Sequence, residues 1–192
     1  MKVTLVGSKW FGAEVLRRLR DAEVGILSVV VPHADDRLAK TAAELGVEVV
    51  VQADPKTVAA EEIAYGSDLI VTAHSHARIS AAALLKAALG GVGYHPSLLP
   101  RHRGKAAVEH TIAAGDPIAG GTVYRLADRM DAGEIVAQEW CFVRKGETAR
   151  ELWERALSPI GLTLLVDSVK TIAGTGKVVG KVQEEQFATV AN

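Results

Sequence analysis

The sequence has little cysteine and no excess of charge of either sign. Cys141 is its one cysteine among 192 residues, which excludes an internal disulfide and a cysteine-rich metal site. The 22 basic residues stand against 23 acidic ones, and no basic stripe stands out. We therefore expect no nucleic-acid partner.

Long apolar runs are also absent. The first residues are followed at once by the charged residues Lys9, Glu14 and Arg17, which is unlike a signal peptide. No window approaches about 18 consecutive apolar residues, so we expect no membrane partner. Because 48% of the residues are hydrophobic, the chain can bury a proper core. We expect a single domain over residues 1–192, located in the cytoplasm.

The first half of the chain alternates apolar strands with helical segments. Strands are predicted at 3–6, 25–31, 47–51 and 68–72. Helices are predicted at 8–19 with Ser8 as cap, at 37–45, from Asp54-Pro55, and at 80–88. Continuously apolar strands are typical of a parallel sheet covered on both faces. This half predicts a Rossmann-like, doubly wound unit.

The second half has a different pattern. A strand at 92–95 leads through a loop to a helix at 105–114, and two further strands follow at 121–126 and 135–143. A long helical pattern then runs from 149 to 172, which Pro159 is expected to break or kink. The fold class that we predict is α/β, with a mostly parallel sheet that ends in an antiparallel part.

Two loops of the first half lie where α/β proteins bind phosphates or metals, but their residues do not favour either kind of site. In the loop Gly7–Gly12, Lys9 stands where a dinucleotide fingerprint has its second glycine, and Trp10 and Phe11 would crowd a phosphate. His74 and His76 have no third ligand nearby, so we expect no metal and favour a polar loop that lines a pocket.

The segment Gly93–Gly104 carries the most information. His95 ends a predicted strand, and Pro96 and Pro100 stiffen the loop that follows. Because an imidazole gains and loses its proton close to neutral pH, a fixed histidine suits acid–base chemistry. A core histidine at the end of a strand explains the same pattern equally well.

Asp131 lies in the loop between the last two predicted strands. It stands before Ala132-Gly133, and an aspartate at such a place is most often a turn residue. From the local pattern alone, we favour a turn over a catalytic carboxylate.

Together these segments resemble the formyltransferase family, which takes a formyl group from 10-formyltetrahydrofolate. The family pattern is a histidine followed by Ser-Leu-Leu-Pro, a downstream Arg-Gly, and later an Asp in Leu-Asp-x-Gly. The matching residues here are His95, 97–100, Arg103-Gly104 and 130–133. The likeness extends over nearly the whole chain, which looks like the N-terminal hydrolase domain of 10-formyltetrahydrofolate dehydrogenase.

The resemblance implies a role for individual residues. His95, as an imidazolium, would stabilise an oxyanion, and Asp131 would orient or charge His95 and relay a proton. The implied folate-contacting residues are Ala77, Arg78, Ile79 and Asp128, and the remaining positions in the site loop are Gly93, Ser97 and Arg103. 10-Formyltetrahydrofolate is the implied co-substrate.

One residue departs from the family pattern. Gly93 stands where the transferases usually have an asparagine, two residues before the histidine. The loss of one oxyanion donor typically costs a factor of about 10²–10³ in rate. Either water or another group fills this place, or the chemistry is slower or different.

The formyl acceptor stays open. Family members that act on tRNA carry a second domain and a basic loop after the second strand, where this chain has residues 32–36, Pro-His-Ala-Asp-Asp. Glycinamide ribonucleotide is disfavoured because Trp10 and Phe11 stand in the first loop. A small-molecule amine such as an amino sugar is narrowly preferred over water, which would make the enzyme a hydrolase. Two other functions stay open, a weak folate-binding module and a dinucleotide-dependent dehydrogenase. The sequence also leaves open whether the chain forms a homodimer.

Overall fold

The computed structural model describes residues 1–191, and seven of their strands form one sheet in the order β3-β2-β1-β5-β7-β8-β9. The chain divides into two compact units, which are residues 1–93 with 169–178, and residues 94–168 with the tail from 179. Two elements, β7 (Gly91–His95) and α6 (Ser158–Thr175), contribute residues to both units. The predicted fold class, mostly parallel with an antiparallel C-terminal part, is confirmed.

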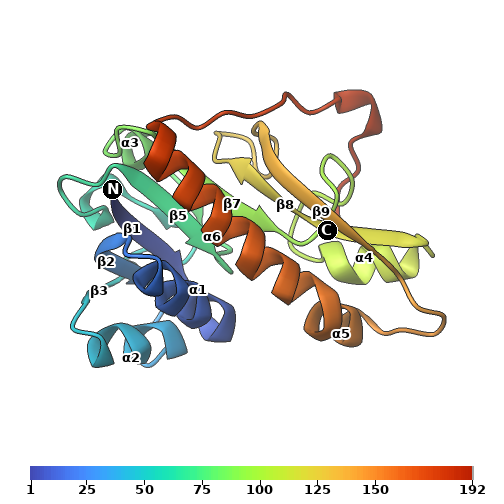
Figure 1. Ribbon diagram of the computed structural model, residues 1–192, viewed down its shortest axis with the longest axis horizontal. Coiled ribbons are helices and arrows are strands. Elements are labelled where there is room, and N and C mark those ends of the chain that lie inside the picture. Colours follow the sequence, from blue (N-terminus) through green and yellow to red (C-terminus); the bar gives the residue numbers. More distant parts are fainter. Residues whose placement is uncertain (192) are drawn as a thin grey trace. The chain divides into compact units, whose positions relative to one another are not determined.

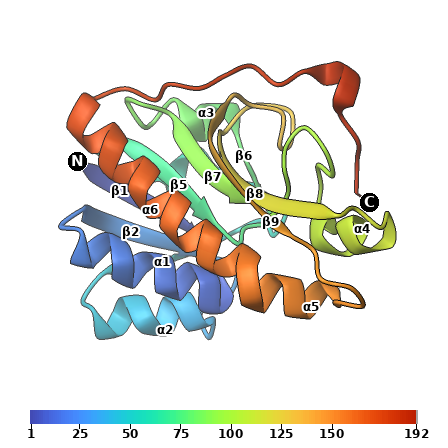
Figure 2. The same cartoon turned by 45° about the vertical axis from the view of Figure 1, so that its right-hand side comes forward.

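Unit 1 is built around parallel strands. Its elements are β1 (Lys2–Gly7), α1 (Lys9–Asp21), β2 (Gly25–Val31), α2 (Arg37–Glu44), β3 (Glu48–Val51), β5 (Leu69–Ala73) and α3 (Ala81–Leu84) (Figure 1). β1 pairs in parallel with both β2 and β5, and β2 pairs with β3. The helices α1 and α2 lie side by side (Figure 2). Strands that are buried on both faces must be apolar throughout, which explains why the sequence pattern located them.

Three predictions in unit 1 are wrong in detail. The helix expected at 80–88 has Ser80 as its cap but already ends at Leu84. The helix expected from Asp54 is replaced by the short strand β4 (Thr57–Val58) and a 3₁₀ turn at Ala60–Glu62, because the Asp54 carboxylate accepts a hydrogen bond from the Lys56 N–H at 2.9 Å. Ser8 occupies the N-cap of α1, but its hydroxyl donates to the His74 carbonyl at 2.7 Å instead of capping the helix.

Unit 2 pairs two antiparallel strands with helices. Its elements are α4 (Ala107–Ala113), β8 (Ile118–Arg125), β9 (Ile135–Phe142), α5 (Ala149–Leu152), a π-helical turn (Trp153–Leu157) and the start of α6. Its core contains Val108, Ala119, Leu152, Ala156 and Leu157. The helix expected at 105–114 is two residues shorter at its start than predicted. Pro159 does not break the helical run, and the irregularity is the π turn just before it.

Tyr94 is held in a slot that two glycines make. A Cβ atom at Gly121 would lie 2.2 Å from the Tyr94 hydroxyl, and one at Gly161 would lie 2.4 Å from the ring. The hydroxyl donates a hydrogen bond to the Leu157 carbonyl at 2.7 Å, and burial raises the pKa of Tyr94 far above its usual range. Because Tyr94 immediately precedes His95, this slot fixes the end of β7.

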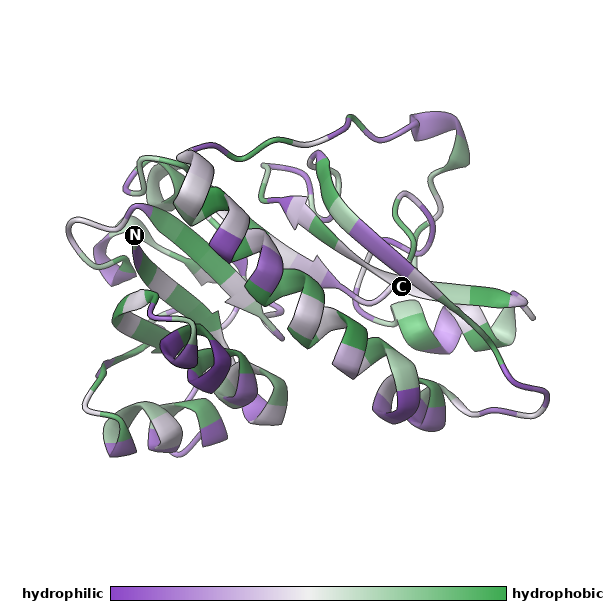
Figure 3. Cartoon of the chain, viewed as in Figure 1, coloured by the Kyte–Doolittle hydropathy of each residue, from purple (hydrophilic) through white to green (hydrophobic). Residues whose placement is uncertain are grey.

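The helical run 149–175 is, by length and composition alone, long and apolar enough to cross a membrane. Half of its most apolar window is buried inside the protein. Figure 3 shows hydrophilic residues interrupting this run, as in a helix with one face toward a core. Core helices pass the same test, so the run is weak evidence for a membrane span.

Candidate active site

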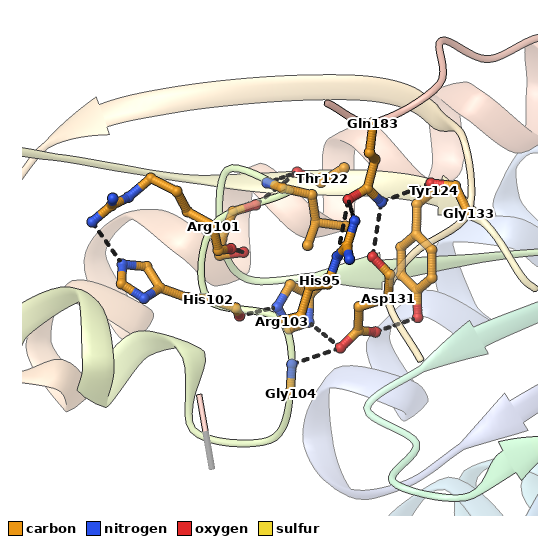
Figure 4. A network of polar contacts seen from close by, with 12 residues as sticks. His95, Arg101, His102, Arg103, Gly104, Thr122, Tyr124, Asp131, Gly133 and Gln183 are labelled. Carbon is orange, nitrogen blue, oxygen red and sulfur yellow. Dashed lines mark hydrogen bonds and ion pairs between the residues drawn. The ribbon is translucent and has the colours of Figure 1, made fainter. Parts of the chain in front are cut away.

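His95 is buried at the end of β7, with 6% of its surface exposed. Its Nε2 lies 2.7 Å from the carbonyl oxygen of His102 (Figure 4). Because a carbonyl only accepts hydrogen bonds, Nε2 carries a hydrogen and donates it. Nδ1 is therefore the ring nitrogen left for acid–base work, and it lies 3.6 Å from Oδ2 of Asp131.

Asp131 points inward although it sits in a turn. Its backbone has a φ of 54°, in the left-handed region, so the local prediction of a turn conformation agrees with the structure. The carboxylate accepts hydrogen bonds from the Gly104 N–H at 2.8 Å and from the Tyr124 hydroxyl at 2.7 Å. A Cβ atom at Gly133 would lie 1.8 Å from the Arg125 carbonyl oxygen, so only glycine fits there. Asp131 is thus both a turn residue and an inward-facing carboxylate, so the two interpretations of its sequence pattern do not exclude each other.

The loop that follows His95 is tied to strand β8. Ser97 donates from its hydroxyl to the Arg101 carbonyl at 2.6 Å, which closes the loop on itself. Thr122 in β8 donates to the Ser97 carbonyl at 2.7 Å and accepts from the Leu99 N–H at 3.1 Å. Gln138 in β9 adds bonds to the Leu99 carbonyl and to Thr122. Hydrogen bonds as well as prolines hold this loop.

A tail residue, Gln183, joins the two loops of the site. Its buried side-chain amide donates to the carbonyls of Asp131 at 2.8 Å and Gly133 at 2.7 Å. Its amide oxygen accepts from the guanidinium of Arg103 at 2.7 Å. Both amide hydrogens and the amide oxygen are thereby used, so the backbone carbonyls of Asp131 and Gly133 are held by one side chain (Figure 4).

Arg103 is buried and acts as a structural cation. It pairs with Glu185 at 2.8 Å, and its hydrogen bond holds the pKa of that carboxyl below its usual value. The neighbouring Gly104 has a φ of 108°, and a Cβ atom there would lie 2.2 Å from the Ala191 carbonyl oxygen. A cavity of about 430 Å³ adjoins this corner. It is lined by Arg103, Gly104, Lys105, Arg129, Met130, Val190 and Ala191.

The residues that the family resemblance assigned to folate lie in both units. Arg78 and Ile79 form β6, which pairs in parallel with β4, and Ala77 precedes it. Asp128 is exposed in the loop between β8 and β9 of unit 2. Gly93 pairs with Thr72 in the ladder of β5 and β7. The structure brings His95, Asp131 and the Arg103-Gly104 corner together within unit 2.

His74 presents a second histidine environment, in unit 1. It follows β5, has a φ of 57°, and its ring lies 5.3 Å from that of His76. Its Nε2 is buried and has no hydrogen-bond partner among residues 1–191. Burial, followed by the charges of Lys9 and His76, lowers the pKa of His74 to about 4. Within the described part of the chain, no group of three or more His, Cys, Asp or Glu side chains is placed to hold a metal ion.

Sequence reasoning missed Tyr124 and Gln183. Tyr124 reads as an ordinary inward residue of a strand, and its hydroxyl carries no pattern of its own. Gln183 lies 52 residues from Asp131 in a segment without periodicity. No local signal could have identified either one.

Known proteins resemble this chain in sequence and in fold. A family model described as formyl transferase matches residues 1–167. The cytosolic 10-formyltetrahydrofolate dehydrogenase of Mus musculus is 33% identical over 201 residues, which covers 98% of this chain and 22% of that protein. The chain thus spans about a fifth of the length of this relative.

Solved structures share the fold at low identity. Glycinamide ribonucleotide transformylase 1 from Symbiobacterium toebii superposes with a TM-score of 0.84 and 22% identity, covering 95% of this chain and 93% of that one. The N-formyltransferase from Helicobacter canadensis, solved with folinic acid and dTDP-3-aminofucose, has a TM-score of 0.81 and 15% identity, covering 100% of this chain and 70% of that one.

Proposed function

The chain belongs to the formyl transferase family, and we propose that it transfers a formyl group from 10-formyltetrahydrofolate to an amine of a small-molecule acceptor. The observation that carries this proposal is the buried pair of His95 and Asp131, with Nδ1 and Oδ2 3.6 Å apart. The relative from Mus musculus bears the name of an enzyme of 10-formyltetrahydrofolate, which supports the same co-substrate.

His95 supplies a positioned proton in this mechanism. Its Nε2–H is committed to the His102 carbonyl, so the ring cannot turn without losing that bond. Nδ1 then donates to the formyl oxygen as the amine attacks and negative charge develops there. Asp131, whose Oδ2 lies 3.6 Å from Nδ1, stabilises the charged ring and relays a proton from the attacking nucleophile toward the departing folate nitrogen.

Folate recognition is assigned to Ala77, Arg78, Ile79 and Asp128. The support in unit 1 is His74, which precedes this segment and has a buried Nε2 without a partner among residues 1–191. A buried polar atom without a partner is costly, and a polar ligand at this edge of β5 would relieve that cost. Neutral His74 can both donate and accept a hydrogen bond, which suits the alternating donors and acceptors of a pterin ring.

Water is the second candidate acceptor. Gly93 offers no side chain beside His95, so the asparagine donor of the transferases has no replacement at that position. The relative with 33% identity is named as a dehydrogenase of 10-formyltetrahydrofolate and not as an amine transferase. With water as acceptor, the same His95–Asp131 pair would release formate.

The remaining assignments are proposals of the same kind. We place the protein in the cytoplasm, following the word cytosolic in the name of its relative. The acceptor is a small molecule, because the solved neighbours named for formyl transfer include one crystallised with a nucleotide sugar. A homodimer, like the absence of nucleic-acid and membrane partners, stays a prediction.

The test is a tetrahydrofolate release assay. Purified protein is mixed with 10-formyltetrahydrofolate, first without an acceptor and then with a panel of amines, and release is followed by absorbance. His95→Ala is compared with His33→Ala, which removes an exposed histidine of unit 1. We expect amine-dependent release that falls by a factor of about 10²–10⁴ in His95→Ala and is unchanged in His33→Ala.

The other outcomes distinguish water from an amine as the acceptor, or refute the proposed function. Rapid release without an amine that requires His95 would establish water as the acceptor and replace the transferase proposal. Release that survives His95→Ala, or protein that neither binds nor turns over 10-formyltetrahydrofolate, would refute the proposed function.

A further inference from the structure

Tyr124 touches both members of the catalytic pair. It lies in β8, and its hydroxyl is 2.7 Å from Oδ1 of Asp131. Its ring meets the His95 ring edge to face, with centroids 6.5 Å apart and planes at 88°. The side chain is therefore packed against the imidazole while it holds the carboxylate that faces that imidazole (Figure 4).

The direction of this hydrogen bond is fixed by chemistry. An ionised carboxylate only accepts, so the phenol must be the donor. Burial, followed by the neighbouring Asp131, raises the pKa of Tyr124 well above its usual value of 10, so the phenol keeps its proton at any working pH. Tyr124 is a neutral donor that cannot take up the charge of Asp131.

Among residues 1–191, no other group around Asp131 donates a hydrogen bond to its Oδ1, so this atom depends on Tyr124. On the carboxylate, Oδ2 is shared between the Gly104 N–H and Nδ1 of His95, so Oδ1 depends on Tyr124. The cation Arg103 reaches Asp131 only through Gln183, which bonds the backbone carbonyl and not the carboxylate, and Arg103 is paired with Glu185. Arg129, in the same loop, is paired with Glu185 as well.

We propose that Tyr124 is a positioning residue for the reaction, which holds Oδ1 of the Asp131 carboxylate and thereby turns Oδ2 toward His95. This inference rests on the proposed function, because it assigns a step to the same pair. A carboxylate that loses one of two buried donors is harder to ionise and free to rotate about its Cβ–Cγ bond. Either change removes the charge that His95 needs beside Nδ1.

Tyr94 provides a matched control. Tyr94 is half-buried, and its phenol also donates one hydrogen bond of 2.7 Å, but to the Leu157 carbonyl. Tyr94→Phe and Tyr124→Phe therefore each remove one phenol oxygen that donates to an oxygen acceptor. A merely structural role for Tyr124 predicts that the two variants behave alike.

The first experiment is the pH dependence of turnover for wild type, Tyr124→Phe and Tyr94→Phe. In Tyr124→Phe we expect kcat at pH 7 to fall about 10-fold and the acid limb to move up by about one pH unit, with KM for 10-formyltetrahydrofolate unchanged. Tyr94→Phe keeps the acid limb of the wild type. An acid limb that does not move in Tyr124→Phe, or moves equally in both variants, would overturn the proposal.

A second measurement does not depend on turnover. The carboxyl carbons of aspartate are labelled with ¹³C, and the Asp131 signal is identified by its loss in Asp131→Asn and titrated by NMR. We expect it to titrate at a higher pH in Tyr124→Phe than in the wild type. Coincident titrations would refute the role of Tyr124 even if the enzyme is active, whereas an inactive wild type with separated titrations would refute only the proposed function.

Site-specific incorporation of 3-fluorotyrosine at position 124 covers the case in which Tyr124→Phe does not fold. Fluorine makes the phenol a stronger donor and leaves the ring and hydroxyl in place. The acid limb and the Asp131 titration should then both move to lower pH. No movement in either, in folded protein, would count against the proposal.

Discussion

Two histidines, His74 and His95, stand at the ends of neighbouring strands, β5 and β7, and their surroundings differ in almost every respect. His74 has a buried Nε2 without a partner among residues 1–191, and its pKa is lowered to about 4. His95 donates from Nε2 to a carbonyl and faces a carboxylate with Nδ1. His74 is thus held neutral, whereas His95 has a carboxylate beside its Nδ1.

The contrast shows that a strand end alone does not make a catalytic histidine. β5 and β7 run parallel, so both histidines emerge at carboxyl ends of the sheet, where α/β folds place ligands. The difference comes from residues distant in sequence, because Asp131 and its supports Tyr124 and Gln183 belong to unit 2 alone. The acid–base role follows the carboxylate and not the strand.

The strongest test of the difference between His74 and His95 is to remove the carboxylate beside His95. Asp131→Asn keeps the shape and tolerates the left-handed backbone, but it leaves His95 without the carboxylate that faces its Nδ1. We expect kcat to fall by a factor of about 10²–10⁴. Turnover within about threefold of the wild type, measured by tetrahydrofolate release, would show that His95 acts without Asp131.

A smaller effect is expected when the support of Asp131 is removed instead of its charge. Gln183→Ala leaves two buried carbonyls and the Arg103 guanidinium short of a partner, so the unfolding free energy should fall by about 2–3 kcal/mol and kcat by about 10-fold. Both are measured by denaturant unfolding and by turnover. Gln186→Ala, an exposed change in the same tail, is the control and should alter neither.

Gln183→Glu separates the bond that Gln183 accepts from Arg103 from the bonds that it donates to the Asp131 loop. The variant keeps an acceptor for Arg103 but loses the N–H donors to the Asp131 loop. If kcat falls as in Gln183→Ala, the bonds to the loop matter for turnover. A kcat equal to that of the wild type would assign the effect of Gln183→Ala to Arg103 alone.

The smallest effect concerns His74 and appears only in acid. The unfolded chain protonates His74 near pH 6.5 and the folded chain near pH 4, so its neutral burial costs stability as the pH falls between these values. His74→Asn, which suits the φ of 57°, removes that cost. Relative to the wild type, the variant should gain about 1–2 kcal/mol between pH 6.5 and pH 4, after allowance for solvent screening.

Denaturant unfolding at a series of pH values measures this gain. His33→Asn, which removes an exposed histidine of the same unit, is measured alongside as the control. A stability difference between His74→Asn and the wild type that does not vary with pH would mean that folding leaves the pKa of His74 unchanged. The comparison with His95 would then lose its basis.

Much of the fold could be predicted because local physics decided it. β5 is buried throughout and β1 is buried apart from Lys2, as expected for apolar strands inside a parallel sheet. The helix expected from Asp54 failed because aspartate before proline also closes a turn on its own backbone, and the sequence does not say which bond is made. The sequence pattern is ambiguous where one side chain, such as that of Asp54, can either cap a helix or close a turn.

Of the candidate site, the sequence indicated only the two residues that we propose to react. His95 and Asp131 carry recognisable neighbours, whereas Tyr124 and Gln183 act through contacts 7 and 52 residues away from Asp131. A strand tyrosine that fills a core and one that donates to a carboxylate have the same sequence pattern. The distinction exists only once the chain is folded.

The Gly104 corner has a consequence for synthesis of the protein. Its N–H binds Asp131, its missing Cβ leaves room for the Ala191 carbonyl, and Gln183 holds the backbone of the Asp131 loop. A ribosome releases His95 and Asp131 well before it releases residues 183–191. The nascent chain therefore carries both side chains of the proposed pair for a time without the contacts that align them, and we expect the onset of activity to wait for a segment that contains neither.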